Sequence, residues 1–108
     1  MRLCGFEVGP DRPFFLIAGP CVVEDDRTMM AVAERLVQLG RSLGMAVCFK
    51  ASFDKANRAR ADAPRGPGLH AGLESLARVR DASGLPVLSD VHEADQAAVV
   101  AEVVDVLQ

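Results

Sequence analysis

Short apolar runs alternate with longer amphipathic segments along most of the chain. The first run, residues 14–18, reads Phe-Phe-Leu-Ile-Ala and ends at Gly19-Pro20. Further runs of the same kind occupy residues 45–49, 86–90 and 103–107. Hydrophobicity that is continuous along a run, and does not alternate with polar residues, indicates a strand buried on both faces, as in a parallel sheet.

Apolar residues at helical spacing fill the intervals between these runs. The acids at 24–26 suit a helix N-cap and first turn, and the helical pattern after them stops at Gly44. A second amphipathic segment begins at Leu69 and ends near Gly84, and a brief third one covers residues 94–102. The pattern therefore predicts a helix after each of the first three strands.

The segment before the first run, residues 3–13, contains turn formers at Gly5 and Gly9-Pro10 and predicts a short hairpin or extended arm. The remaining order of strand, helix, strand, helix, strand, helix, strand is typical of a parallel α/β fold. No Gly-x-Gly-x-x-Gly motif follows the first strand, which disfavours a dinucleotide-binding fold.

Polar side chains gather where the predicted strands end. They are Cys21, Lys50, Ser52, Asp90 and His92. In a (β/α)8 barrel the catalytic residues lie at this end of the strands. A barrel needs about 250 residues, whereas the chain has 108. We therefore expect residues 1–108 to form one domain, the N-terminal half of a (β/α)8 TIM barrel with about four parallel strands. Its first and fourth strands would be edges with exposed apolar faces.

Composition narrows the class of protein. Twelve Lys and Arg residues against 15 Asp and Glu give a net charge of −3, which argues against binding nucleic acid through overall charge. No apolar run is long enough for a membrane span or a signal peptide. Three cysteines do not make a disulfide framework. These features predict a cytoplasmic protein without a membrane or nucleic-acid partner.

Positive charge is concentrated in one segment. Both lysines of the chain, Lys50 and Lys55, lie in it together with Arg58, Arg60 and Arg65. Ammonium groups act as point-charge partners for phosphate, and guanidinium groups bind it as a fork. The segment thus favours a small anionic ligand, although a solvated basic loop is an equal alternative on charge alone.

Two further positions allow both a chemical and a structural interpretation. Cys21 is either a small buried side chain or a thiolate metal ligand, while Cys48, inside a strand, is expected to pack. Asp90 and His92 can serve as a general base, a hydroxyl acceptor or metal ligands, and Asp90 can equally cap the following helix. His70 is expected on the surface.

Taken together, these segments resemble the 3-deoxy-D-manno-octulosonate 8-phosphate synthases. The resemblance rests on residues 17–24, 49–58, 65–69, 90–93 and 103–108. Its most specific part is Lys-Ala-Ser-Phe-Asp-Lys-Ala-Asn-Arg at 50–58. Related enzymes that use erythrose 4-phosphate carry Lys-Pro-Arg-Thr where this chain has Lys-Ala-Asn-Arg.

The resemblance implies a homotetrameric (β/α)8 barrel of lipopolysaccharide synthesis. It implies an aldol-type condensation of phosphoenolpyruvate, D-arabinose 5-phosphate and water to 3-deoxy-D-manno-octulosonate 8-phosphate and phosphate. By resemblance, Lys55 and Asp90 are catalytic. The implied substrate-binding residues are Lys50, Ser52, Lys55, Asn57, Arg58 and Gln108.

The resemblance also implies a cofactor. Cysteine at position 21 marks the metal-dependent branch, with Fe²⁺, Mn²⁺, Co²⁺ or Zn²⁺ held also by His, Glu and Asp of strands outside this chain. Two alternatives remain open at this stage. One is a 3-deoxy-D-arabino-heptulosonate 7-phosphate synthase that acts on erythrose 4-phosphate. The other is a truncated or non-catalytic fragment that binds phosphate.

Overall fold

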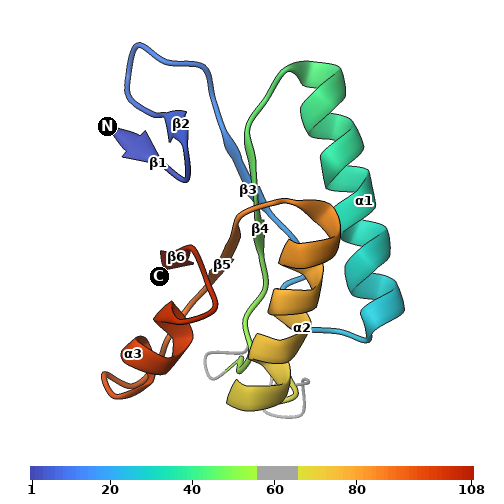
Figure 1. Cartoon of the computed structure of the whole chain (residues 1–108), viewed down its shortest axis with the longest axis vertical. Helices are drawn as coiled ribbons and strands as arrows, with labels where there is room; N and C mark the ends of the chain where they lie inside the picture. Colours follow the sequence, from blue (N-terminus) through green and yellow to red (C-terminus); the bar gives the residue numbers. More distant parts are fainter. Residues whose placement is uncertain (56–65) are drawn as a thin grey trace.

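The described part of the chain forms a four-stranded parallel sheet preceded by a small antiparallel hairpin (Figure 1). The structure is a computed structural model, and it describes residues 1–55 and 66–108. The hairpin pairs β1 (Arg2–Leu3) with β2 (Phe6–Glu7). The sheet consists of β3 (Leu16–Ala18), β4 (Val47–Lys50), β5 (Val87–Ser89) and β6 (Val106–Leu107), ordered in space as in the chain. The predicted fold class, part of a (β/α)8 barrel with a hairpin before it, is confirmed.

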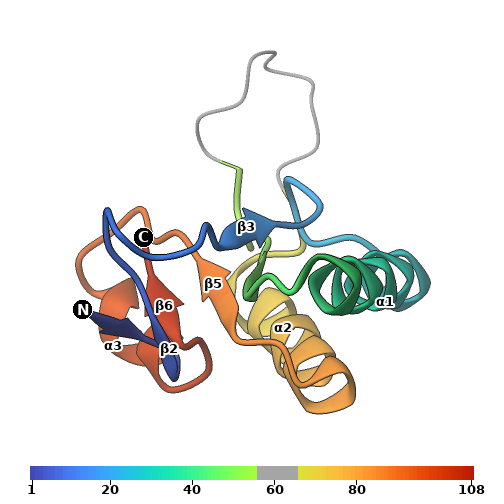
Figure 2. The ribbon, with the colours of Figure 1, turned by 90° about the horizontal axis from the view of Figure 1, so that it is seen from above.

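Among residues 1–55 and 66–108, three helices connect these strands, as the hydrophobic pattern predicts. They are α1 (Asp26–Leu43), α2 (Leu69–Ser83) and α3 (Gln96–Ala101). In Figure 2, α1 and α2 lie next to each other on the same side of the sheet. None of the helices in the described ranges is long and apolar enough to cross a membrane.

The ends of α1 follow the predicted signals. The Asp25 carboxylate accepts a hydrogen bond from the Thr28 backbone N–H at 2.7 Å, and this bond lowers the pKa of the carboxyl. At the other end Gly44 adopts φ 60°, the left-handed conformation that glycine takes at no steric cost. The sequence thus fixes both ends of the helix through local chemistry.

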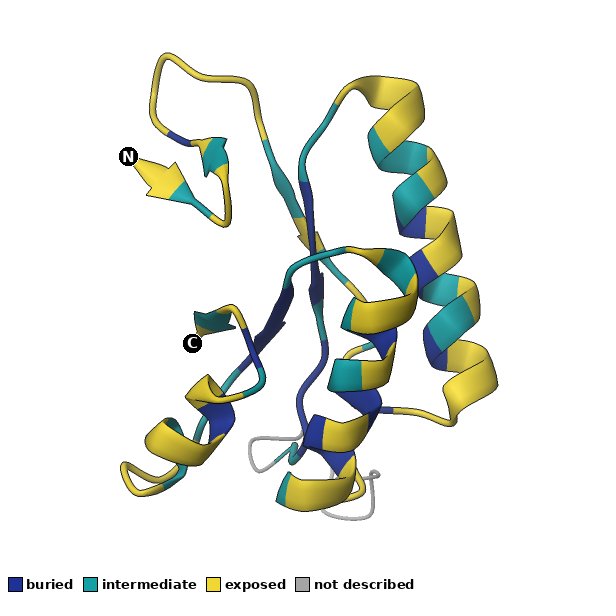
Figure 3. Cartoon of the chain, viewed as in Figure 1, coloured by how far each residue is buried: buried dark blue, intermediate teal, exposed yellow. Residues whose placement is uncertain are grey.

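The core lies between the helices and the sheet (Figure 3). Met29, Leu76 and Val100 from the three helices meet strand residues such as Phe49 and Val87, and all five are fully buried or nearly so. All three residues of β5, and Val47 to Phe49 of β4, are buried. The prediction of strands buried on both faces is therefore confirmed for the two central strands.

The same prediction is wrong for β3. Phe14 is 88% exposed and precedes the strand, while Ile17 within it is 43% exposed. The cause is position in the sheet, because β3 is an edge strand paired to β4 alone. Leu107, on the opposite edge strand β6, is 42% exposed, so both edges carry the exposed apolar side chains expected of a half barrel.

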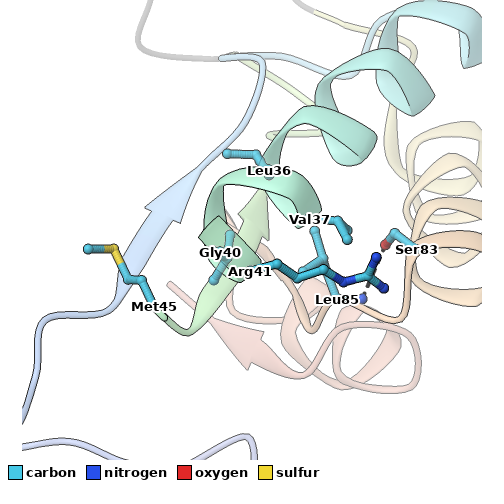
Figure 4. A pocket seen from close by; sticks show the side chains of 8 residues that line it. Leu36, Val37, Gly40, Arg41, Met45, Ser83 and Leu85 are labelled. Carbon is cyan, nitrogen blue, oxygen red and sulfur yellow. Dashed lines mark hydrogen bonds between the residues drawn. The ribbon is translucent and has the colours of Figure 1, made fainter. Parts of the chain in front are cut away.

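A small cavity of about 290 Å³ opens at the amino-terminal end of the sheet (Figure 4). Its lining comes from the ends of α1 and α2 and the start of β4: Leu36, Val37, Gly40, Arg41, Met45, Val47, Ser83 and Leu85. The Ser83 hydroxyl donates to the Val79 backbone oxygen and accepts from the Leu85 N–H. Both hydrogen bonds of the Ser83 hydroxyl are therefore made with the adjacent backbone.

Candidate active site

The carboxyl ends of the strands are joined by backbone pairing that extends past the strands themselves. Val22 forms a parallel bridge with Ser52, and the Ser52 N–H donates to the Cys21 backbone oxygen at 3.3 Å. The Gln108 N–H donates to Ser89 O, and the Val91 N–H donates to Gln108 O, each at 3.1 Å. The residues that follow β3, β4, β5 and β6 are thereby held at one end of the sheet.

Close approach of β3 and β4 at this end requires glycine. A Cβ atom at Gly19 would lie 1.9 Å from the backbone oxygen of Lys50. Any side chain at position 19 would therefore separate the two strands. The Gly19-Pro20 pair, which the sequence marks only as a turn, brings Cys21 close to the lysine that ends β4.

Ser52 connects two of the predicted site residues. Its hydroxyl is fully buried and donates to Asp90 Oδ1 at 2.5 Å, and its oxygen accepts from Lys55 Nζ at 3.1 Å. Three side chains from two strand ends thus form one connected group of ammonium, hydroxyl and carboxylate. Because Asp90 accepts this bond, and α3 has Asp95 at its N-cap, the alternative of Asp90 as a helix cap is wrong.

Lys50 forms a second link across the sheet. Its ammonium group donates to Gln108 Oε1 at 2.5 Å, although the two residues are 58 positions apart in the chain. Lys50 ends β4 and Gln108 follows β6, so the bond spans the strand between them. The structure therefore brings together a lysine and an amide that the resemblance includes among the substrate-binding residues.

A cleft of about 220 Å³ lies beside these groups. It is lined by Ile17, Ala18, Gly19, Pro20, Cys21, Lys50 and Lys55. Both lysines of the chain and the exposed Cys21 therefore line one space. A small anion that entered this cleft would meet two lysines, whose charge attracts phosphate and carboxylate groups.

Sequence reasoning left the role of His92 open. Its Nε2 atom lies 2.5 Å from the backbone oxygen of Asp54 and 3.7 Å from Asp90 Oδ2. The side chains of His92 and Asp90 are 23% and 19% exposed. The contact with Asp54 depends on how the loops after β4 and β5 meet, and no spacing in the sequence signals it.

Other predicted residues fall away from this group or outside the described ranges. Asn57, Arg58, Arg60 and Arg65 belong to residues 56–65, which the structure does not describe. Cys48 is fully buried in β4 as expected, and burial raises the pKa of its thiol to about 12. His70 is exposed, as expected for the first turn of α2.

Comparison with known proteins decides the family. The model of the DAHP synthetase I family matches residues 4–108, nearly the whole chain. The chain belongs to the DAHP synthetase I family.

Within this family, three similar curated relatives carry the same name. A 2-dehydro-3-deoxyphosphooctonate aldolase of Albidiferax ferrireducens is 56% identical over 108 residues, which is all of this chain and 38% of the relative. Proteins of the same name from Paracidovorax citrulli and Polaromonas naphthalenivorans are 56% and 53% identical over the same length and share. The chain thus spans 38% of the length of these relatives, and the predicted resemblance is confirmed.

The family resemblance implies a divalent metal, and the described residues offer one ligand for it. The exposed Cys21 thiol borders the cleft and is available as a ligand. Within the described ranges, however, no group of three or more His, Cys, Asp or Glu residues is placed to hold a metal ion. These residues supply one candidate ligand, which is not a metal site by itself.

Proposed function

We propose that this chain supplies the first four strands of an enzyme that makes 3-deoxy-D-manno-octulosonate 8-phosphate. The reaction joins phosphoenolpyruvate, D-arabinose 5-phosphate and water, and releases inorganic phosphate. The observation that carries the proposal is the connected polar group at one end of the sheet, Lys55–Ser52–Asp90 beside Lys50–Gln108. The name of the relatives supports the eight-carbon product over other sugar acids.

The residue types suit this chemistry. Carbon 3 of the enolpyruvate attacks the sugar aldehyde, and water captures the positive charge that develops at carbon 2. Two phosphorylated substrates repel each other, and the ammonium groups of Lys50 and Lys55 offset that repulsion and orient the approach. Because both lysines border the cleft, we assign phosphoenolpyruvate to it, with Gln108 as a further contact through Lys50.

Other groups are assigned to the sugar. Lys55 lies between the two substrates, since its ammonium group both borders the cleft and contacts Ser52. We assign Asp90, which follows β5, to the sugar hydroxyls. Ser52 is assigned to the sugar as well, because its hydroxyl is bonded to Asp90. Asn57 and Arg58 are assigned to the arabinose phosphate from the family resemblance alone, because they lie outside the described residues.

We propose Cys21 as the contribution of this chain to a divalent metal site completed by strands that it does not contain. When bound, Fe²⁺, Mn²⁺, Co²⁺ or Zn²⁺ would supply Lewis acidity next to the cleft. The exposed thiol at the end of β3 supports this assignment. We further propose that the assembled enzyme is a cytoplasmic homotetramer of lipopolysaccharide synthesis.

The test uses a completed enzyme, in which residues 1–108 are joined to the C-terminal segment of the Albidiferax ferrireducens relative. We expect phosphate release from phosphoenolpyruvate that requires both arabinose 5-phosphate and a divalent metal. The 108-residue chain assayed alone is the matched control, and we expect it to be inactive. Release by the chain alone would show that four strands suffice and would refute the inference that the half barrel needs the missing strands for activity.

A second candidate is supported by the family match itself, whose description names DAHP synthetase. That activity would take erythrose 4-phosphate in place of arabinose 5-phosphate. The completed enzyme offered both sugars at equal concentration separates the two proposals. Preference for erythrose 4-phosphate would reverse our assignment and would leave the proposed phosphoenolpyruvate cleft unchanged.

A further inference from the structure

His92 makes a contact that the proposed chemistry does not use. Its Nε2 atom lies 2.5 Å from the backbone oxygen of Asp54, 38 residues earlier in the chain. A carbonyl oxygen can only accept a hydrogen bond, so Nε2 must carry the proton and donate it. The contact therefore fixes which nitrogen of the neutral ring is protonated.

The ring is also packed in place. Its centroid lies 6.0 Å from that of Phe53, at an interplanar angle of 60°. Phe53 is buried, and its backbone oxygen accepts from the Gly68 N–H at 3.1 Å. His92 therefore bonds to the first backbone carbonyl beyond a residue that is itself anchored.

Asp54 is the residue immediately before Lys55. The chain after β4 is held at Ser52 by backbone bonds to the end of β3, and at Phe53 by burial and by Gly68. The bond from His92 holds the next residue, Asp54. His92 follows β5, as Asp90 does. The bond thereby joins the loop that bears Lys55 to the loop that bears the carboxylate.

We propose that His92 is a positioning residue that holds the Asp54 carbonyl and so fixes Lys55 relative to Asp90. The proposal deepens the proposed function and rests on it, because Lys55 is the group that would meet both substrates. His92 itself need not touch a substrate. A displacement of Lys55 of about 1 Å would cost about 100-fold in turnover.

Two substitutions separate this role from simple packing of the ring. Glutamine places an amide N–H near the position of the imidazole Nε2 and can still donate to Asp54 O, whereas phenylalanine keeps the ring beside Phe53 and cannot donate. In the completed enzyme, we expect His92→Phe to lower kcat about 100-fold with a smaller change in KM for phosphoenolpyruvate. We expect His92→Gln to recover most of kcat, and both variants to melt within a few degrees of the parent.

The opposite ranking would overturn the proposal. Full activity in His92→Phe would show that the ring only packs. Equal loss in both variants would show that imidazole acts in another way, such as proton transfer.

A second measurement does not depend on the reaction. Nitrogen NMR of ¹⁵N-histidine in the completed enzyme, at a pH where the ring is neutral, reports which nitrogen carries the proton. We expect Nε2–H in the parent. A ring that exchanges between tautomers would contradict the proposed hydrogen bond from His92 to the Asp54 carbonyl. If the parent makes no sugar acid but shows Nε2–H, the proposed function fails while the contact itself stands.

Discussion

The two ends of the sheet use their polar side chains in different ways. At the carboxyl end, Lys50 bonds to Gln108 and Ser52 bonds to Asp90, which are side-chain contacts between residues far apart in the chain. At the amino end, the Asp105 carboxylate accepts from the Val87 backbone N–H, and Ser83 bonds to the backbone of its own helix and turn. These two bonds at the carboxyl end join side chains across the sheet, whereas the two at the amino end complete the backbone. His92, at the carboxyl end, bonds to backbone as well, at the Asp54 oxygen.

The difference separates function from stability. A side chain that completes backbone hydrogen bonding lowers the free energy of the fold and leaves no group directed at a ligand. A lysine that ends at a cleft, beside a second lysine, instead concentrates charge that folding does not require. In a parallel α/β barrel this division between ends is expected, because catalytic residues collect where the strands finish.

The largest expected contrast is between a cysteine inside the sheet and one at its carboxyl end. Cys48 lies inside β4 with a pKa of about 12, raised mainly by burial, whereas Cys21 is exposed beside the cleft. Since only the thiolate reacts, a rise of about three pKa units slows alkylation about 1,000-fold relative to an ordinary thiol. Iodoacetamide at pH 8, followed by mass spectrometry of peptides, should label Cys21 and leave Cys48 until the protein unfolds.

The same shift has a consequence for stability at high pH. The Cys48 pKa is higher in the folded chain than the ordinary value of 9.0, so the folded form holds the proton more tightly. The contribution of Cys48 to the free energy of unfolding is therefore complete below pH 9 and is lost as pH rises towards 12. Replacement by Ala should remove this part of the alkaline loss, and early labelling of Cys48 in folded protein would contradict the burial on which it depends.

Removal of one cation at each end should affect activity unequally. In the completed enzyme, Lys50→Met should lower kcat/KM for phosphoenolpyruvate about 100-fold, because a charge aimed at the substrate is lost. Arg41→Met, which removes an exposed cation beside the cavity of Figure 4, is the matched control and should leave the rate unchanged. Similar losses in both variants would indicate a general effect of net charge.

Two glycines give a smaller, structural contrast. A methyl group at Gly19 meets a backbone oxygen at 1.9 Å, whereas one at Gly40 in α1 meets the Met45 oxygen at 2.9 Å. Gly19→Ala should destabilise the fold by about 3 kcal/mol, since backbone must move. In Gly40→Ala, a gain of about 1 kcal/mol in helix propensity should offset much of the strain. Urea unfolding midpoints measure both, and equal midpoints would show that β3 and β4 can separate freely.

The smallest effect concerns the N-cap of α1, which lies at the carboxyl end of the sheet but is not bonded to the described polar side chains of the site. Asp25→Ala should lower the melting temperature slightly, because Thr28 N–H loses its acceptor. The pKa of Asp25 is lowered in the fold, so its contribution is present above the ordinary value of 3.8 and disappears as pH falls through the lowered one. Glu24→Ala is the control, and a melting difference that persisted in strong acid would point to another cause.

Local signals in the sequence determine much of this fold. Asp25, Gly44 and Gly84 mark helix ends through their own backbone or side-chain chemistry, and the apolar runs mark β4 and β5. Hydrophobicity alone extended the first strand to residue 14 and buried it on both faces, whereas the strand count of a half barrel correctly predicted that this strand is an exposed edge. The helix predicted at 94–102 is shorter, at 96–101.

The site was predictable in its membership and not in its connections. The sequence shows that polar residues follow the predicted strands, and the resemblance pointed to Lys50, Ser52 and Asp90. The bond from Ser52 to Asp90, and the one from His92 to Asp54, depend on the register of β4 against β5 and on how two loops meet. Such contacts are set by tertiary packing, to which spacing along the chain gives no access.

Because each strand of the sheet pairs with its predecessor in the chain, the structure can grow in the order in which a ribosome makes it. Every new strand finds its partner already present, and no later segment has to thread between two existing ones. The bond between Lys50 and Gln108 is an exception, since its lysine waits for an amide made 58 residues later. During synthesis the helix-backed core would therefore form first, and the charged end would acquire its final arrangement after it.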